Sequence, residues 1–291
     1  MKIAAFNVKK LGWRKVNKVL VRTNLIKIVS RYSVVVMLEV VDQSGKAMDK
    51  FLTELNNSRK NKRHPYAMKC SKSLGRSSYK EKFVFFYRQA EVSVIDTYQY
   101  KEGHKDVLAR EPFILKLKCP NTVVQNLVLI PVHTKPEDTP RELDALHDVV
   151  KAVKKRWRTD NIMILGDFNA DGHYLSEKKK KKIRICYRPY HWLIADDVDT
   201  TTSHSNDHTY DRIVVFGNDM YKAVEPGSAQ TFNFQKAYRL SKAKTQDISD
   251  HYPVEVELKE EEEDDGEEDD EEEENEQPKD DYSAFYHPYY Y

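Results

Sequence analysis

Apolar runs recur along the chain, and most predict strands buried on both faces, because such strands need not alternate in polarity. The clearest run, at residues 162–165, is followed by Gly166, Asp167 and Asn169. Further strands are expected at 2–8, 34–38, 83–87, 92–98, 113–117, 126–132, 213–215 and 254–256. The pattern therefore predicts a sheet protein whose central strands are covered on both sides.

Three segments have helical periodicity instead. Apolar residues at i, i+4, i+7 and i+8 predict a helix over 19–31, and a similar stripe marks another over 48–55. In the third segment, 139–157, Thr139 and Glu142 are spaced as a capping box with Pro140 at the first helical position. Strands alternating with helices indicate the α/β class, as one large domain or two small ones.

Polar residues stand where several of these strands begin or end. They are Asn7, Glu39, His133, Asp167 and Asn169 after strands, and Asp211, Asp250 and His251 before them. For Asp167 and Asn169 alone, an Asx turn that closes the strand is an equally simple explanation. The repetition argues otherwise, because a carboxylate at the end of a buried strand is costly unless it meets water, a partner or a metal.

Charge is unevenly distributed along the 291 residues. Residues 260–291 contain 17 of the 47 acids and a single base, Lys279. Residues 1–259 keep 47 bases against 30 acids, a net charge of +17, whereas the whole chain has +1. A body this basic suits a polyanion, although a merely soluble basic surface would have the same composition. The acidic, tyrosine-ended segment 260–291 is too charged to pack and is expected to be disordered.

The strand-end residues have the chemistry of phosphodiester hydrolysis. Carboxylate and amide oxygens suit Mg²⁺ or Mn²⁺, whereas Zn²⁺ would favour more histidine or cysteine. Two histidines oriented by carboxylates supply a general base for water and a general acid for a leaving alkoxide. The sequence thus predicts a metal-assisted hydrolase that acts on phosphate esters.

Separated motifs along the chain resemble the deoxyribonuclease I family, closest to its deoxyribonuclease I-like branch, over about residues 2–259. They are the strand ends at Asn7 and Glu39, the segment 74–81, Arg110-Glu111-Pro112, 131–134, 166–170, 210–214 and 249–255. The resemblance implies two packed mixed β-sheets flanked by helices, a four-layer sandwich over 1–259. It also implies a divalent-metal endonuclease that cuts double-stranded DNA and leaves 5′-phosphate ends.

The resemblance further assigns roles to individual residues. His251 oriented by Asp211 would activate water, and His133 oriented by Glu81 would protonate the leaving oxygen. Five residues would together hold the metal ion and the scissile phosphate: Glu39, Asn7, Asp167, Asp250 and Asn169. Which of them contacts the metal and which the phosphate stays open. Arg110 resembles a backbone-phosphate contact, and Arg76 and Tyr79 resemble minor-groove contacts, for which an ordinary exposed aromatic is the alternative at Tyr79.

The chain departs from the family pattern at several positions. Gly172 and His208 stand where relatives have a disulfide, so that bridge cannot form, and Val41 replaces a base beside Glu39. The three cysteines are odd in number and without metal-like spacing, which indicates a reducing compartment. The acidic tail has no counterpart in the family. It either solvates the domain or competes with DNA for the basic body.

Partners and location follow from the same observations. The N-terminal apolar stretch is too short for a signal peptide, so an intracellular, monomeric protein without a membrane span is expected, although a chain lacking its signal would look the same. By resemblance, actin is a candidate partner and Ca²⁺ a candidate structural ion. The competing functions are another phosphodiesterase or phosphatase of the same superfamily, and a non-catalytic DNA- or histone-binding protein.

Overall fold

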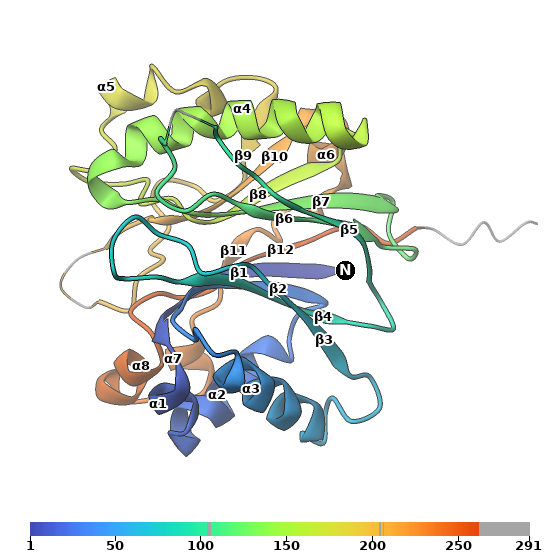
Figure 1. Ribbon diagram of the computed structural model, residues 1–291, viewed down its shortest axis with the longest axis vertical. Helices are drawn as coiled ribbons and strands as arrows, with labels where there is room; N and C mark the ends of the chain where they lie inside the picture. The colour runs from blue at the N-terminus through green and yellow to red at the C-terminus, as the bar shows by residue number, and fades with distance from the viewer. Residues whose placement is uncertain (104–105, 204, 206, 262–291) are drawn as a thin grey trace, which may run out of the picture. The chain divides into compact units, whose positions relative to one another are not determined.

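Two six-stranded mixed sheets form the centre of the computed structural model, which describes residues 1–103, 106–203, 205 and 207–261 (Figure 1). The first sheet has the order β11-β12-β1-β2-β4-β3. Its strands are β1 (Lys2–Leu11), β2 (Val34–Val40), β3 (Tyr66–Cys70), β4 (Lys82–Arg88), β11 (Gln230–Thr231) and β12 (Val254–Glu257). Only β1 and β2 run parallel among its pairs.

The second sheet has the order β5-β6-β7-β8-β10-β9. Its strands are β5 (Ser93–Gln99), β6 (Phe113–Lys118), β7 (Asn126–His133), β8 (Ile162–Asp167), β9 (Tyr190–Trp192) and β10 (Asp211–Phe216). Here β7 and β8 are the parallel pair. Each sheet therefore has one central pair of strands whose carboxyl ends lie at the same edge.

Helices cover the outer face of each sheet and complete four layers (Figure 1). Over the first sheet lie α1 (Trp13–Val16), α2 (Val19–Val29), α3 (Lys46–Asn57), α7 (Phe234–Ala237) and α8 (Lys242–Ile248). On the side of the second sheet lie α4 (Thr139–Trp157), α5 (Glu177–Lys180) and α6 (Gly217–Ala223), with the 3-10 turns η1 (Pro136–Asp138) and η2 (Arg184–Cys186). The predicted sandwich of two mixed sheets flanked by helices is confirmed.

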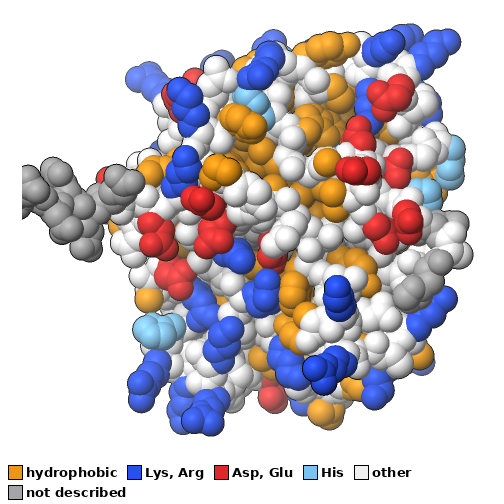
Figure 2. All heavy atoms as spheres, turned by 180° about the vertical axis from the view of Figure 1, so that it is seen from behind, with side chains coloured by type: hydrophobic (Ala, Val, Ile, Leu, Met, Phe, Trp, Pro, Cys, Tyr) orange, Lys and Arg blue, Asp and Glu red, His pale blue; other side chains and the backbone are white. Residues whose placement is uncertain are grey.

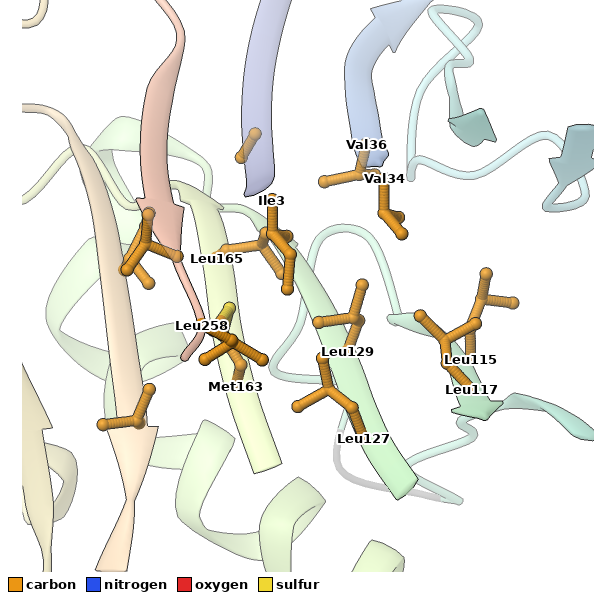
Figure 3. Packing of buried hydrophobic residues seen from close by; sticks show 14 of the residues in the cluster. Ile3, Val34, Val36, Leu115, Leu117, Leu127, Leu129, Met163, Leu165 and Leu258 are labelled. Atoms are coloured by element: carbon orange, nitrogen blue, oxygen red, sulfur yellow. The ribbon is translucent and has the colours of Figure 1, made fainter. Parts of the chain in front are cut away.

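Apolar side chains fill the space between the sheets and the space beneath each helical layer. The inter-sheet cluster brings Ile3 and Val36 of the first sheet against Leu129 and Leu165 of the second (Figure 3). A second cluster packs α2 and α3 onto the first sheet, and a third packs α4 onto the second. Strands with apolar contacts on both faces explain the nearly continuous apolar runs of the sequence.

Most long elements were predicted from the sequence, and several short ones were not. The helices over 19–31, 48–55 and 139–157 and the expected strands are present, while β3, β9, β11, α1 and α6 to α8 were missed because they are short. The capping box was wrong. Asp138 is the N-cap residue, Thr139 is fully buried against Thr134, and Glu142 accepts backbone N–H groups of Ala109 and Lys135. The preceding turn η1 continues directly into α4, so no free helix end remains at Thr139.

Met1–Glu261 forms one compact unit. The predicted disordered tail falls outside the described residues from Glu262 onward. Among the helices that the structure describes, none combines the length and apolar character required to cross a bilayer.

Candidate active site

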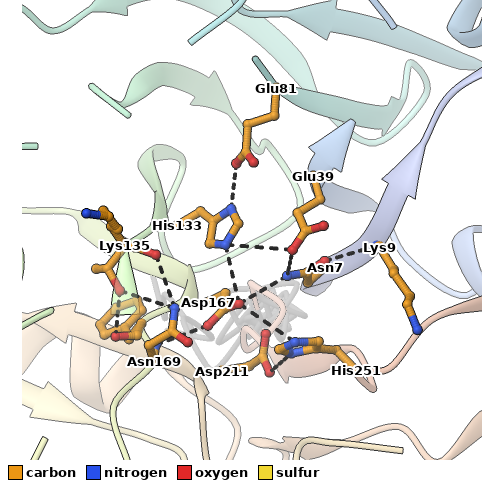
Figure 4. Close-up of polar contacts among 12 residues, drawn as sticks. Asn7, Lys9, Glu39, Glu81, His133, Lys135, Asp167, Asn169, Asp211 and His251 are labelled. Carbon is orange, nitrogen blue, oxygen red and sulfur yellow. Dashed lines mark hydrogen bonds and ion pairs between the residues drawn. The ribbon is translucent and has the colours of Figure 1, made fainter. Parts of the chain in front are cut away.

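The carboxyl ends of the two central strand pairs meet at one edge of the sandwich. Asn7 is the last residue of β1 before its pairing with β2 is interrupted, and its Nδ2 donates to Glu39 Oε1 at 3.1 Å and to Asp167 Oδ2 at 3.0 Å. Glu39 belongs to the first sheet and Asp167 to the second, so the buried Asn7 amide links the two sheets across the site (Figure 4). The common rim predicted from the sequence is present.

An irregular backbone turns Glu39 toward this rim. The pairing register of β2 shifts against both β1 and β4 near its end, and Glu39 has φ +57. Lys9 and Lys10 on the adjoining part of β1 have φ +45 and +53. A side chain in this left-handed region costs on the order of 1–2 kcal/mol, and a bulge re-aims the side chain that it carries. The distortion places Glu39 beside Asn7, where its Oε2 also accepts the Lys10 N–H at 3.2 Å.

His133 at the end of β7 forms the first histidine–carboxylate pair. Its Nδ1 lies 2.5 Å from Glu81 Oε1, and Arg110 Nε approaches the same oxygen at 3.0 Å. All three side chains are largely buried. Burial lowers the pKa of His133, but the Glu81 carboxylate outweighs this effect, so the pKa lies above its usual value.

His251, just before β12, forms the second pair. Its Nδ1 lies 2.7 Å from Oδ2 of Asp211, the fully buried first residue of β10. Burial lowers the pKa of His251, yet the charges of Asp211 and Asp167 raise it to about 10. For Asp211, burial and the neighbouring Asp167 raise the pKa above its usual range despite the imidazole. Both imidazoles thus carry the carboxylate partner predicted for them.

Asp167 lies between the two pairs. Its Oδ2 is 3.6 Å from Nε2 of His133 and 3.8 Å from Nε2 of His251 (Figure 4). Burial raises its pKa, but the two imidazoles and the Asn7 amide lower it to below the usual value, which keeps Asp167 ionised. A phosphate group beside this carboxylate is therefore within reach of both imidazoles.

Asn169 combines the two explanations that its motif left open. Its backbone N–H donates to Asp167 Oδ1 at 3.0 Å, which is an Asx turn, and its φ is +47. Its side-chain Nδ2 donates to the Thr134 carbonyl at 3.1 Å. The turn therefore holds Asp167 in place at the site. Among the described residues, the Asn169 side-chain oxygen has no hydrogen-bond partner.

The remaining predicted residues lie around this centre, not in it. Asp250 is half exposed and pairs with Lys9 at 3.5 Å. Arg76 pairs with Asp106 at 3.3 Å and with Asp138 at 3.5 Å.

Arg110 lies behind the first histidine pair and not on an open surface. Its Nε contacts Glu81, and its Nη1 donates to the His133 carbonyl at 3.3 Å. Tyr79 is half buried, and its enclosed hydroxyl has no hydrogen-bond partner among the described residues. Burial, and the nearby charges of Glu39 and Glu81, raise the Tyr79 pKa.

The structure adds one polar residue that the sequence analysis did not single out. Ser249 Oγ donates to the Asn7 carbonyl at 2.6 Å and accepts the His251 N–H at 3.1 Å. It therefore fixes the loop that carries His251 against β1. Its position in the Ser-Asp-His motif was the available signal.

The donor set at the rim fits a hard divalent cation. Glu39 and Asp167 present carboxylate oxygens at the rim, and the buried Oδ1 of Asp211 has no hydrogen-bond partner within the described part of the chain. Donor atoms of Asp167, Asp211 and His251 also lie within 4.8 Å of one another. Oxygen donors in this number match Mg²⁺ or Mn²⁺. Of the four predicted metal ligands, Asp250 alone is directed to a lysine instead.

The position of the missing disulfide is occupied by a polar contact. A Cβ added to Gly172 would lie 3.5 Å from the His208 ring, so the two positions do face each other. Asp171 Oδ2 lies 3.2 Å from His208 Nδ1 and accepts the Thr209 N–H at 2.9 Å. Cys70, Cys119 and Cys186 are all free. The loop after β8 is therefore fastened without a covalent bridge.

Activity is expected to survive a thiol reductant, because reduction removes no bond from this fold. Plasmid nicking after incubation with and without dithiothreitol measures this directly, with a Gly172→Cys/His208→Cys variant as the oxidisable control. Loss of activity of the unmodified protein in dithiothreitol would contradict the expectation.

Comparison with known proteins identifies the family of this chain. Residues 4–251 match the model of the Endonuclease/Exonuclease/phosphatase family. Deoxyribonuclease-1 of Oryctolagus cuniculus is 41% identical, over 89% of this chain and 92% of the relative. Deoxyribonuclease-1-like 1 of Homo sapiens is also 41% identical, over 89% of this chain and 84% of the relative.

Solved structures share the fold at low sequence identity. A family protein from Leptotrichia buccalis superposes with a TM-score of 0.60 at 16% identity, covering 89% of this chain and 99% of that one. The human Nocturnin catalytic domain gives 0.59 at 13% identity, covering 90% and 94%.

Fold and rim together define an Endonuclease/Exonuclease/phosphatase protein, and the chain belongs to that family. Within it, the chain belongs to the deoxyribonuclease I-like branch and is a deoxyribonuclease that hydrolyses DNA. A non-catalytic DNA- or histone-binding protein is thereby set aside.

Proposed function

We propose that the protein is a divalent-metal-dependent endonuclease that cuts double-stranded DNA to 5′-phosphate ends by histidine acid–base catalysis. The observation that carries the proposal is the pair of imidazoles on either side of Asp167. Each has its own carboxylate on Nδ1 and directs Nε2 toward the same Asp167 oxygen, at 3.6 and 3.8 Å. Hydrolysis of a phosphodiester requires one proton to be taken and one to be given, and this site has a group for each.

The two histidines have different roles in the proposal. His251 accepts a proton from the attacking water, and Asp211 stabilises the imidazolium that forms. His133 donates its Nε2 proton to the 3′ oxygen as the bond to phosphorus breaks. The Glu81 carboxylate raises the pKa of His133 above its usual value, which favours the protonated ring that this step needs. Attack on phosphorus with departure of the 3′ oxygen leaves the phosphate on the 5′ end.

Glu39 and Asp167 would hold the divalent cation, with Asn7 and Asn169 as neighbouring amides. A bound Mg²⁺ or Mn²⁺ would supply positive charge against the scissile phosphate, and the same charge would lower the pKa of His251 toward the range of a general base. Asn7 orients both carboxylates through its Nδ2, and Arg110 holds Glu81 against His133. The chain thus fixes each acid before substrate arrives.

Removal of divalent cations is expected to reduce plasmid nicking by about 10²-fold or more, because the cation provides several kcal/mol of charge stabilisation in such reactions. The measurement is nicking in EDTA, followed by titration with Mg²⁺ or Mn²⁺. Glu39→Gln should need more metal than the unmodified protein for half of its maximal rate, and Glu137→Gln, an exposed acid of η1, should not. Full activity in EDTA would contradict the proposal.

A further inference from the structure

Four cationic side chains gather on the loop between α3 and β3. They are Arg59, Lys60, Lys62 and Arg63, all exposed, and the exposed His64 follows them. Asn57, Arg59, Lys62 and Arg63 line an open hollow of about 620 Å³. Figure 2 shows Lys and Arg side chains gathered at the lower left, on the side of the molecule that carries α3. We call residues 59–64 the basic loop.

The basic loop lies at the end of the sandwich opposite the active site. The His64 carbonyl accepts from Arg88 Nη1 at 3.1 Å, and the Arg88 N–H donates to the Ser33 carbonyl, directly before β2. Glu39 is near the other end of β2, about 17 Å farther along at 3.3–3.4 Å per residue. A ligand on the basic loop therefore does not occupy the catalytic rim.

A buried residue fixes the shape of the basic loop. Asn61 is fully buried, and its Nδ2 donates to Ser30 Oγ, the Leu55 carbonyl and Ser58 Oγ at 2.7–3.0 Å. Its Oδ1 accepts from Arg88 Nη2 at 3.2 Å. With the centre of the loop held inside, its four bases are displayed on a rigid support. Binding of a ligand to these side chains therefore loses less conformational entropy than binding to a flexible segment would.

These four bases lack acidic partners within the described residues, where none of them forms an ion pair. Acids of the neighbouring elements are already engaged, Glu54 of α3 with Arg22 and Glu91 after β4 with Arg88. The carboxyl end of α3 favours one or two nearby cations through the helix dipole. Four cations within five residues are more than the helix end can stabilise, and they repel one another. A bound polyanion would relieve this repulsion.

We infer that the basic loop is a second nucleic-acid site, which binds the phosphate backbone of a DNA segment other than the one in the catalytic cleft. The inference rests on the deoxyribonuclease activity, because an enzyme of DNA meets polyphosphate as its substrate. A long or supercoiled DNA can bring a second segment to the loop, whereas a short duplex cannot reach both surfaces. The basic loop would thus hold the enzyme on long DNA between cuts.

The test compares two variants of the full chain with equal charge change. The loop variant carries Arg59→Gln, Lys60→Gln, Lys62→Gln and Arg63→Gln. The control carries Gln at four exposed lysines of α4, α6 and α7 without ion pairs among the described residues: Lys151, Lys155, Lys222 and Lys236. Binding to supercoiled plasmid is measured from about 50 to 200 mM salt with the catalytic step blocked by EDTA. Nicking of plasmid and of a duplex of about 10 base pairs is measured with Mg²⁺.

Loss of the loop charges should weaken plasmid binding about tenfold at low salt. It should also reduce the slope of log affinity against log salt by about 2 to 4, since each phosphate contact contributes about 0.9. Nicking of the short duplex should stay within twofold, and the control variant should match the unmodified protein in slope. Equal slopes for loop and control variants would overturn the inference, as would equal losses on short and long DNA.

Two further measurements separate other causes. A thermal melt detects a purely structural role at the end of α3, which would shift the melting temperature without changing the salt slope. Flotation with vesicles of anionic lipid tests a membrane surface as the alternative polyanion. If vesicle binding depends on the loop charges and plasmid binding does not, the loop binds membranes and not DNA. If short-duplex nicking is absent in the unmodified protein, the proposed function fails and not the loop.

Discussion

His251→Ala is expected to reduce plasmid nicking with Mg²⁺ by about 10²–10⁴-fold, the usual contribution of a positioned acid or base. The substitution removes the group that faces Asp167 at 3.8 Å and leaves Asp211 without its imidazole partner. Rates of plasmid nicking under single-turnover conditions measure the loss, and DNA binding in EDTA shows whether the substrate still binds. His147→Ala serves as the matched control. It removes a histidine of α4 that is hydrogen-bonded to Tyr190 of β9.

A second substitution distinguishes a catalytic role of His251 from a structural one. If Asp211 acts by orienting His251, then Asp211→Asn should lower the rate on its own and add little to His251→Ala, because residues that act as a unit are non-additive. Independent losses would mean that Asp211 acts elsewhere. Nicking by His251→Ala at the rate of the unmodified protein would refute the proposed mechanism altogether.

The layers of the fold follow from the sequence because their cause is local. Runs such as 162–165 and 34–38 are apolar without alternation, and only strands covered on both faces satisfy that pattern. The register between strands follows from no such pattern. Neither the pairing of His133 with Asp167 nor that of Asn7 with Leu38 could be derived from the sequence. What the sequence supplied was the type of residue at each strand end.

The irregular parts of the site escaped prediction for a physical reason. Glu39 has φ +57 and Asn169 φ +47, and for Glu39 no local preference favours this conformation. Tertiary contacts impose it, in particular the Asn7 amide on Glu39 and the Thr134 carbonyl on Asn169. Likewise, Thr139 and Glu142 have the spacing of a capping box but are engaged by Thr134 and by Lys135 and Ala109. Local rules fail where residues outside the motif bind the same groups.

Gly166→Ala is expected to destabilise the fold by about 4 kcal/mol or more, which places it among the largest single-residue effects. Gly166 has φ +144, and a Cβ there would lie 2.0 Å from the Val132 carbonyl oxygen. That oxygen belongs to β7, which pairs with β8 at this position, while Arg212 of β10 pairs on the other side. The clashing atom belongs to the backbone, which cannot rotate away as a side chain could. The two strands must therefore separate.

The same clash links stability to catalysis, because Val132 precedes His133 and Gly166 precedes Asp167. Separation of β7 from β8 would change the 3.6 Å contact between His133 and Asp167 even in molecules that fold. Urea unfolding and plasmid nicking should therefore both be impaired in Gly166→Ala. Gly217→Ala has a positive φ of +84 but open space around its Cβ, so it should cost only about 1–2 kcal/mol and keep its nicking rate. If the two variants are equally stable, the close approach of Gly166 to β7 is not the reason for a glycine in the Leu-Gly-Asp motif.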